Sequence, residues 1–370
     1  MKSRKLKLVG WQSWTHCTEK SKLIKRIRYY SPFGDNNKDI KISKNSSKQR
    51  PITGWCSWNA FMLSVNENAV IDIAKWIKNQ KQKIPLEYIL VDDGWADWGD
   101  WAKPNYLKFP NGILSTSRKI DLLGFKPGLW IAPYLVDPKS EVFKNHPEWL
   151  ARDKNGKIID GKKNYFFDPL IPSKKYLLDL ENKNAYSYIL NCFKTIIKVW
   201  KIKLLKVDFL YAGHFNPKYK SSKAPDFLLK KLLTDIKNID KDVVLIACGC
   251  PLYPAAGIVD AMRISDDVIL PPLKNIWYIN HLLHTIRLNQ LKDNFELRKT
   301  TKDLWVIDPD MFVCHPSFGL TDKQILEFQK IVINSNGVIF LGDYLPDLNK
   351  SQLNKYIYPL FKTKLSKKNK

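Results

Sequence analysis

The segment "LLKVDFLYAG", residues 204–213, has the pattern of a buried strand that ends in charged side chains. Lys206 and Asp208 interrupt an otherwise apolar run, and Gly213 follows shortly after them. Burying a charge costs desolvation energy unless the charge is paired, so these two side chains require a partner or a pocket. Residues two apart in a strand point to the same side, so we expect both to face one site.

Similar apolar runs recur along the chain and alternate with amphipathic helical stretches. The strand-like runs are "ITGWCSW", "LEYILVDDGW", "KPGLWIAPYLV", "IKLLKVDFL", "DVVLIACG", "VDAMRIS", "LWVIDPDMFV" and "GVIFLGD". Continuous apolar strands separated by helices are typical of a parallel sheet. About eight such units predict an α/β fold, a (β/α)8 TIM barrel. An open doubly wound sheet is the alternative, but no GxGxxG follows the first run.

Helices are expected between these runs, and the flanks differ from the centre. The helical stretches begin near Glu67, Ser140, Asn184, Ala224, Asn275 and Thr321. Residues 1–50 are basic and polar, with one aromatic island, "GWQSW", and predict a short N-terminal extension. We expect the barrel over residues 51–345 and a basic C-terminal helix or tail over residues 346–370.

The composition excludes several functional classes. The net charge is +25, but the 61 Lys and Arg residues are spread over all 370 positions without a basic stripe or RNA-binding signature, so no nucleic-acid partner is expected. No apolar run of eighteen residues predicts a membrane span. The N-terminus lacks the apolar core of a secretory signal, which favours the cytoplasm.

The six cysteines do not suggest a disulfide framework or a metal site. Their spacing is irregular, and reduced thiols agree with a cytoplasmic location. Cys248 and Cys250 form a close pair, but no second Cys/His pair completes a zinc site. His281 and His284 lie on an expected helix and the other histidines are isolated. We therefore expect no metal and no cofactor.

Carboxylates gather at the ends of the predicted strands, where a barrel places its active site. Two acidic pairs and one triplet stand out: Asp92 and Asp93, Asp266 and Asp267, and "DPD" at 308–310. Metal-assisted hydrolysis, Mg²⁺-dependent phosphoryl or enolate chemistry and glycoside hydrolysis all use clustered aspartates. No phosphate-binding glycine loop supports the second.

Aromatic residues near the strand ends favour glycoside hydrolysis. The set comprises Trp55, Trp58, Trp95, Trp98, Trp101, Trp130 and Tyr134. Sugars present CH faces that stack on aromatic rings and hydroxyls that pair with carboxylates. Any one of these tryptophans taken alone is more simply core filler, but the group beside "DDGW" fits a sugar pocket.

The motifs resemble the catalytic barrel of family 36 glycoside hydrolases, the α-galactosidases or melibiases. "GWCSWNAF", "YILVDDGW", "GFKPGLWIAPYLV", "LLKVDFLYAG", "GCPLYPAAGIVDAMRISDD" and "DPDMF" carry the resemblance, in that order, from about Thr53 to Gly342. "GWQSW" is similar to part of the sandwich domain that precedes the barrel in this family. The resemblance implies a retaining α-galactosidase that acts on α-galactoside oligosaccharides.

The resemblance also implies roles for individual residues. Asp208 matches the nucleophile and Asp267 the general acid/base. The substrate-binding positions are Asp92 and Asp93 (sugar hydroxyls), Trp130 (aromatic wall), Lys206 and Arg263 (sugar contact or carboxylate orientation), Cys248 (a weaker match in the pocket lining) and Trp58. Retention predicts about 5–5.5 Å between the two catalytic carboxyl groups.

Each proposed role has a physical counterpart and an alternative. The charge of Lys206 should favour the ionised form of Asp208, while a structural salt bridge is the other reading. Asp267 must start protonated, so we expect apolar or acidic neighbours around it, including Asp266. Asp266 is itself the rival acid/base. Asp92 and Asp93 could instead bond backbone in a turn, and Arg263 could be a plain ion-pair partner.

The sequence also departs from the family pattern. The family has a large N-terminal sandwich domain, but only about fifty residues precede the barrel here. A lone barrel could cover its exposed face by forming a homo-oligomer or binding a partner. A raffinose-synthase-like transferase, another retaining α-glycosidase and a non-catalytic sugar-binding protein remain as alternative functions.

Overall fold

A computed structural model describes residues 50–80, 83–161, 174–215, 224–269 and 277–362. Eight parallel strands form one sheet, and each lies inside one of the eight predicted runs. They are β1 (Thr53–Cys56), β2 (Tyr88–Val91), β3 (Lys126–Ile131), β6 (Leu204–Val207), β7 (Val244–Ala247), β8 (Ala261–Arg263), β9 (Val306–Asp308) and β10 (Ile339–Leu341). The order β10-β1-β2-β3-β6-β7-β8-β9 confirms the predicted (β/α)8 TIM barrel.

The sheet closes into a barrel where β9 and β10, the two ends of the strand order, meet. The Val338 amide donates to the Ile307 carbonyl at 2.8 Å, and Phe312 forms a parallel bridge with Leu341. Gly337 permits this approach, because a Cβ at this position would lie 2.0 Å from the Ile307 oxygen. Any side chain at residue 337 would therefore force β9 and β10 apart.

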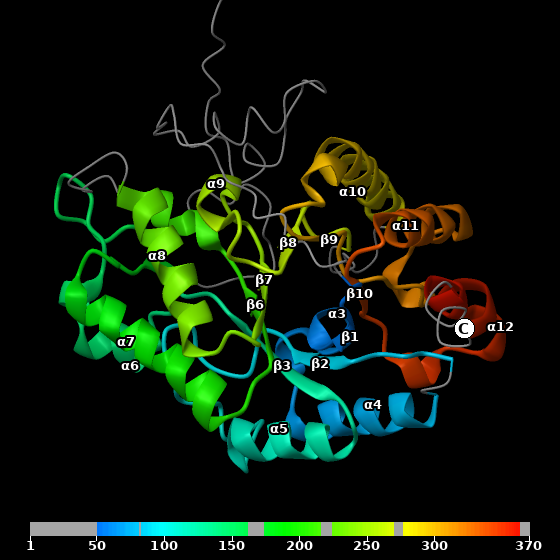
Figure 1. Cartoon of the computed structure of the whole chain (residues 1–370), viewed down its shortest axis with the longest axis horizontal. Coiled ribbons are helices and arrows are strands. Elements are labelled where there is room, and N and C mark those ends of the chain that lie inside the picture. The colour runs from blue at the N-terminus through cyan, green and yellow to red at the C-terminus, as the bar shows by residue number, and fades with distance from the viewer. Residues whose placement is uncertain (1–49, 81–82, 162–173, 216–223, 270–276, 363–370) are drawn as a thin grey trace, which may run out of the picture.

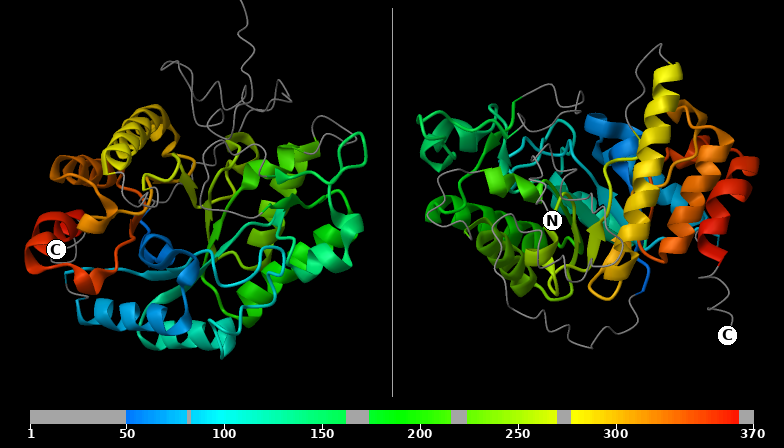
Figure 2. Two further views of the ribbon diagram at one scale, coloured as in Figure 1. Left: turned by 180° about the vertical axis from the view of Figure 1, so that it is seen from behind. Right: turned by 90° about the horizontal axis from the view of Figure 1, so that it is seen from above.

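Helices surround the sheet, with α4 and α5 below it, α7 and α8 to the left and α10 to α12 to the right in Figure 1. The long helices are α4 (Glu67–Asn79), α5 (Gly112–Leu122), α7 (Lys183–Lys194), α8 (Ala224–Ile239), α10 (Trp277–Arg298) and α11 (Asp322–Ser335). Short ones are α3 (Ser57–Phe61), α6 (Glu141–Asn145), α9 (Leu252–Ala255) and α12 (Lys350–Gln352). Figure 2 shows α10 and α11 packed along one side of the barrel.

Local sequence signals set several helix boundaries. The Asn66 side chain accepts from the Ala69 amide at the start of α4, and Thr321 and Gln324 form a capping box at the start of α11. The helix that was expected to run from Asn184 to Trp200 is α7 followed by a π-helical turn, Thr195–Val199. Helix α5 was not predicted.

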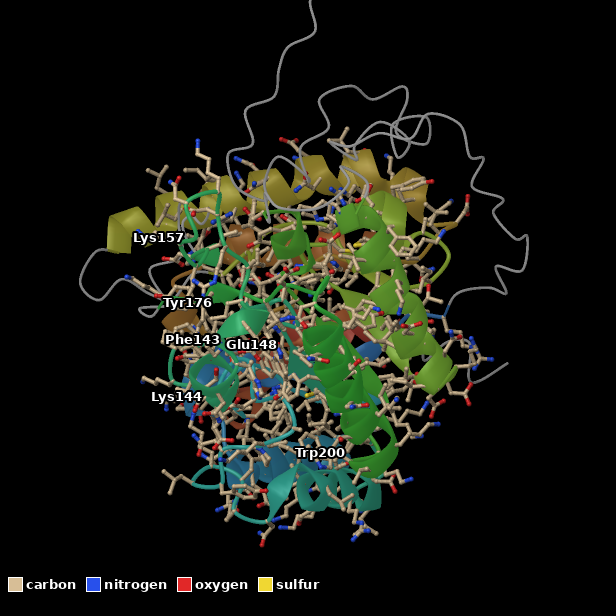
Figure 3. All side chains as sticks on the ribbon, turned by 90° about the vertical axis from the view of Figure 1, so that its left-hand side faces the viewer. Phe143, Lys144, Glu148, Lys157, Tyr176 and Trp200 are labelled. Carbon is tan, nitrogen blue, oxygen red and sulfur yellow. The ribbon has the colours of Figure 1, made fainter. Side chains whose placement is uncertain are left out.

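A two-stranded antiparallel sheet was also not predicted. Strand β4 (Leu135–Val136) pairs with β5 (Tyr176–Leu177) in the long connection between β3 and β6. Figure 3 shows Phe143 of α6 beside Tyr176, and their rings stack with centroids 4.9 Å apart. The Asp137 amide, next to β4, donates to the Trp98 carbonyl at 2.7 Å, so this small layer is bonded to the segment that follows β2.

Two apolar cores hold the barrel. The larger one lies between the sheet and the helices. The smaller one fills the barrel and comprises Ile52, Cys56, Tyr88, Leu90, Leu204, Ile246, Cys248, Ala261, Val306, Met311, Val338 and Phe340. Leu204 points inward, so Lys206, two residues later, points inward as well. The strands thus deliver charged side chains to the carboxyl end of the barrel interior.

The predicted flanking segments are only partly described. The N-terminal extension, including "GWQSW", lies outside the described residues apart from Arg50. In the predicted C-terminal segment, α12 is followed by a π-helical turn, Leu353–Ile357, and a 3-10 helix, Tyr358–Phe361. Among the described helices, none has the length and apolar character to cross a membrane. The domain boundaries at residues 51 and 345 remain predictions.

Candidate active site

Lys206 forms a buried ion pair with a carboxylate that is distant in sequence. Its Nζ donates to Asp92 Oδ2 at 2.8 Å, and both side chains are buried. The Cys56 thiol donates to the same oxygen at 3.1 Å. The expected charge partner of Lys206 was Asp208, and the direct partner is Asp92. The bonds thereby join β1, the end of β2 and β6, although β3 lies between β2 and β6 in the sheet.

Asp208 follows β6 and is held by two hydrogen bonds. Trp130 Nε1 donates to its Oδ2 at 3.1 Å, and the Phe209 amide donates to its Oδ1 at 2.7 Å. Phe209 has φ 54°, a left-handed conformation that is uncommon for a bulky residue. Burial raises the pKa of Asp208, while Lys206 and the Trp130 hydrogen bond lower it. Lys206 therefore acts on Asp208 in the expected direction without pairing with it.

Arg263 links three acidic residues at the end of β8. Its Nη2 lies 2.8 Å from Asp267 Oδ1 and 2.5 Å from Asp310 Oδ1, and its Nη1 lies 4.0 Å from Asp308 Oδ2. The guanidinium is buried, and these carboxylates raise its pKa against the effect of burial, so it stays charged. Arg263 thus pairs directly with Asp267, and its role in the reaction stays a prediction.

Asp266 and Asp267 are neighbours with opposite environments. Asp266 is buried and paired with Arg287 of α10, and Gln290 also donates to it. The Asp267 side chain is 50% exposed. As expected for adjacent residues, only one is open to solvent. The surroundings of Asp267 differ from the expectation: it faces a cation instead of an apolar wall, and the charge of Asp266 is compensated by Arg287.

Asp267 nevertheless acts electrostatically on Asp208. The negative charge of Asp267 raises the pKa of Asp208 beyond the effect of burial. The two carboxylates come from β6 and from the segment after β8, and they therefore face the same region above the barrel. That arrangement allows one group to attack while the other transfers a proton.

Asp93 sits in a turn and also faces an aromatic ring. Its Oδ1 accepts from the Gly94 amide at 2.7 Å and from Trp98 Nε1 at 2.8 Å. Burial raises the pKa of Asp93 to about 7. Lys175 places its Nζ 4.5 Å from the Trp98 ring centre and pairs with Asp137. The hydrogen bond from the Gly94 amide agrees with the interpretation of Asp93 as a turn residue. The bond from Trp98 also places Asp93 next to the aromatic cluster.

The aromatic cluster supports the carboxylates more than it lines an open surface. The Trp130 ring packs against Trp98 at 5.1 Å, Trp101 at 5.8 Å and Phe209 at 6.3 Å between centroids. Trp130 is only 2% exposed, so its indole N–H, bonded to Asp208, is its main polar contribution. Trp95 donates to the Trp130 carbonyl and fixes the strand below it.

Cys248 and Trp58 border the same space. Cys248 is buried after β7 inside the barrel, and burial raises the pKa of its thiol, so it stays neutral. Trp58, on α3, is half-buried and packs against the barrel interior. Among the described residues, no group of three His, Cys, Asp or Glu side chains could hold a metal ion.

Some contributors were not singled out from the sequence. Lys175 and Arg287 come from a connection and from a helix, and no local pattern distinguishes them from other basic residues. Asp308 and Asp310 were recognised as polar residues at a strand end, but their contact with Arg263 was not foreseen. Their signal was the repeated aspartate in "DPD".

The fold and the site define a class: a (β/α)8 barrel with a cluster of carboxylates at the carboxyl ends of its strands, where barrel enzymes act. A family model described as Melibiase matches residues 35–223, about half of the chain. The chain belongs to the Melibiase family.

Curated relatives agree with this assignment. α-Galactosidase AgaA of Geobacillus stearothermophilus is 26% identical over 169 residues, which is 44% of this chain and 21% of the relative. α-Galactosidase Mel36A of Lactobacillus acidophilus is 29% identical over 179 residues, 46% of this chain and 21% of the relative. The matched region thus spans about a fifth of the length of these relatives.

Solved structures share the fold. The α-galactosidase TtGalA of Thermus thermophilus, in complex with p-nitrophenyl α-D-galactopyranoside, has a TM-score of 0.71 at 22% identity, covering 85% of this chain and 62% of that one. AgaA of Geobacillus stearothermophilus has a TM-score of 0.60 at 17% identity, covering 86% and 42%.

Proposed function

We propose that this barrel is the catalytic domain of a retaining α-galactosidase, which removes terminal α-linked galactose from oligosaccharides. The observation that carries the proposal is the pairing of a fixed, partly buried carboxylate, Asp208, with an open one, Asp267, that acts on it electrostatically. Membership of the Melibiase family and the α-galactosidases among its relatives support the choice of galactose.

The proposed reaction proceeds by double displacement. Asp208, ionised and held by Trp130 and Phe209, attacks the anomeric carbon while Asp267 donates its proton to the departing glycosidic oxygen. Asp267 then removes a proton from water, which releases galactose with its configuration retained. Lys206 favours the ionised form of Asp208, and Arg263 holds the carboxylate of Asp267.

Other residues would bind the sugar. Asp92 is already engaged by Lys206 and Cys56, so its remaining lone pairs would accept from a sugar hydroxyl. We assign hydroxyl contacts to Asp93, and the pocket wall to Trp58, Trp130 and Cys248. No cofactor takes part in this reaction scheme.

The first test replaces the nucleophile. Asp208→Asn should lower kcat/KM for p-nitrophenyl α-galactoside by on the order of 10⁴-fold or more, because the covalent step is lost. Asp208→Gly with azide should regain turnover of an activated aryl α-galactoside and yield β-galactosyl azide. Asp303→Asn, an exposed carboxylate at a distance from the barrel mouth, is the matched control and should keep full activity.

Several outcomes would distinguish the alternatives. A folded wild-type chain without turnover, equal to Asp208→Asn, would overturn the proposal. Galactose binding by calorimetry without turnover would indicate a sugar-binding protein. Galactosyl transfer to sucrose exceeding hydrolysis would indicate a transferase, and NMR detection of β-galactose as the first product would exclude retention.

A further inference from the structure

Asp310 contacts both the cation and the backbone that position Asp267. One oxygen, Oδ1, lies 2.5 Å from Arg263 Nη2 and accepts from the Met311 amide at 2.6 Å. The other, Oδ2, accepts from the Val268 amide at 2.6 Å. Val268 directly follows Asp267. The Asp310 carboxylate, from the segment after β9, therefore bonds both to the backbone next to Asp267 and to the guanidinium that pairs with Asp267.

The backbone at Asp310 has an uncommon conformation, and the contacts of its carboxylate account for it. Asp310 has φ 97°, and its side chain is only 1% exposed. A non-glycine residue keeps such a conformation only where its surroundings determine it strongly. The Asp310 amide donates to Asp308 Oδ1 at 3.0 Å, which helps to hold the turn. A second strained residue, Phe209, adjoins Asp208, so both proposed catalytic carboxylates have strained backbone at or near their supports.

We propose that Asp310 is a positioning residue for proton transfer: it shares Arg263 with Asp267 and anchors the Val268 amide, so that Asp267 stays in place and remains a proton donor. This inference rests on the proposed function. The same nitrogen, Nη2, serves both carboxylates. With Asp310 ionised, part of the positive charge of Arg263 is compensated. Without it, the full cation would favour the carboxylate form of Asp267.

Other charged groups around this pair are accounted for. They are Asp308 near Arg263, Asp208 after β6, the neutral Cys248 after β7, and Asp266 with its partner Arg287. Burial raises the pKa of Asp310 to about 7, and Arg263 opposes that rise. Asp310 is therefore ionised on the alkaline side, where loss of the proton from an acid catalyst limits the rate.

The test compares Asp310→Asn with Asp343→Asn. Asp343 is also buried with its pKa raised to about 7, but it bonds the Cys314 and His315 amides and touches neither Arg263 nor Val268. We expect Asp310→Asn to move the alkaline limb of the kcat profile down by about one pH unit. It should also lower kcat/KM for melibiose about tenfold more than for a dinitrophenyl α-galactoside, which needs little protonation.

A purely structural role would give a different pattern. Equal losses for both substrates with an unmoved alkaline limb, as expected for Asp343→Asn, would overturn the inference while leaving the proposed function intact. Loss of galactosidase activity from the wild type itself would instead count against the proposed function.

An amide NMR titration of the wild-type chain makes the test independent of turnover and of how well a variant folds. The Val268 amide signal should shift as Asp310 ionises near pH 7, because that amide donates to Asp310 Oδ2 at 2.6 Å. A Val268 signal that does not change over this pH range would overturn the inference.

Discussion

The two ends of the barrel interior are built from the same strands and have opposite characters. Leu204 and Lys206, Ala261 and Arg263, and Val306 and Asp308 are pairs two residues apart, apolar first and charged second. Two residues of a strand span about 7 Å, so the change is abrupt. The amino end resembles any packed core, whereas the carboxyl end contains ions held by one another.

The comparison suggests that the amino end serves stability and the carboxyl end serves chemistry. An ion pair inside a barrel offers little stability over a well-packed apolar pair, but losing one partner is costly because the other charge remains buried. The charged end is therefore fragile in a way that the apolar end is not. Three substitutions test this difference between the two ends.

Lys206→Met should have the largest effect on stability. It leaves the Asp92 carboxylate buried without its cation, and we expect a loss of about 3–5 kcal/mol in the free energy of unfolding, measured in urea. Catalytic activity should fall as well, because the charge of Lys206 favours ionised Asp208. Lys203→Met, at an exposed position three residues earlier, is the matched control. Equal stability of the two variants would show that the charged end does not depend on this pair.

Leu204→Ala removes apolar volume from the other end of the same strand. Leu204 is fully buried, and the cavity should lower the free energy of unfolding by about 2–5 kcal/mol. In contrast with Lys206→Met, kcat/KM should change less than about twofold, because the strand backbone remains paired. Leu107→Ala, at a residue that is 97% exposed, should be nearly neutral. A large loss of activity in folded Leu204→Ala would contradict the separation of the two ends.

Asp343→Asn should have the smallest of the three effects. It should change how steeply the free energy of unfolding depends on pH. Burial raises the pKa of Asp343 to about 7, and the Cys314 and His315 amides that donate to it lower that pKa. The folded state retains a proton that the unfolded state releases, so this group makes stability fall as pH rises from about 4 to about 7. The variant should flatten the slope by up to about 1.4 kcal/mol per pH unit.

Urea unfolding at several pH values between 4.5 and 7 measures this effect. Asp93 and Asp310 have raised pKa values as well, so a residual slope should persist in the variant. Asp303→Asn is the control and should keep the wild-type slope. An unchanged slope in Asp343→Asn would mean that this carboxylate is not protonated in the folded chain.

The sequence was sufficient for the barrel because each strand has its own local signature. Eight apolar runs, each followed by polar residues, indicated both the strands and the face that carries the site. Helix α5 was missed because in "GILSTSRKIDL" the apolar residues at each end are separated by five consecutive polar residues, 115–119, which obscures the helical period. The sheet of β4 and β5 was missed because its two-residue strands lie about forty positions apart.

The partners within the site could not be read from local patterns. Lys206 and Asp208 are two residues apart, but the bond of Lys206 to Asp92 depends on β2 and β6 lying on either side of β3 in the closed sheet. Similarly, the contact of Arg287 with Asp266 depends on where α10 packs. Sequence reasoning identified which strand ends carry the carboxylates, and the packing of the fold determines which cation each one meets.

The closure of the sheet has a consequence for how this chain is made. Thr53 of β1 pairs with Ile339 of β10, so one edge of the first barrel strand has no partner until the last strand has been synthesised. Such distant contacts slow folding, and during synthesis the edges of β1 and β9 remain open until β10 has left the ribosome. The growing chain would therefore expose two unpaired, aggregation-prone strand edges for most of its synthesis. Chaperones that bind nascent chains should accordingly affect the yield of folded protein more than its final stability.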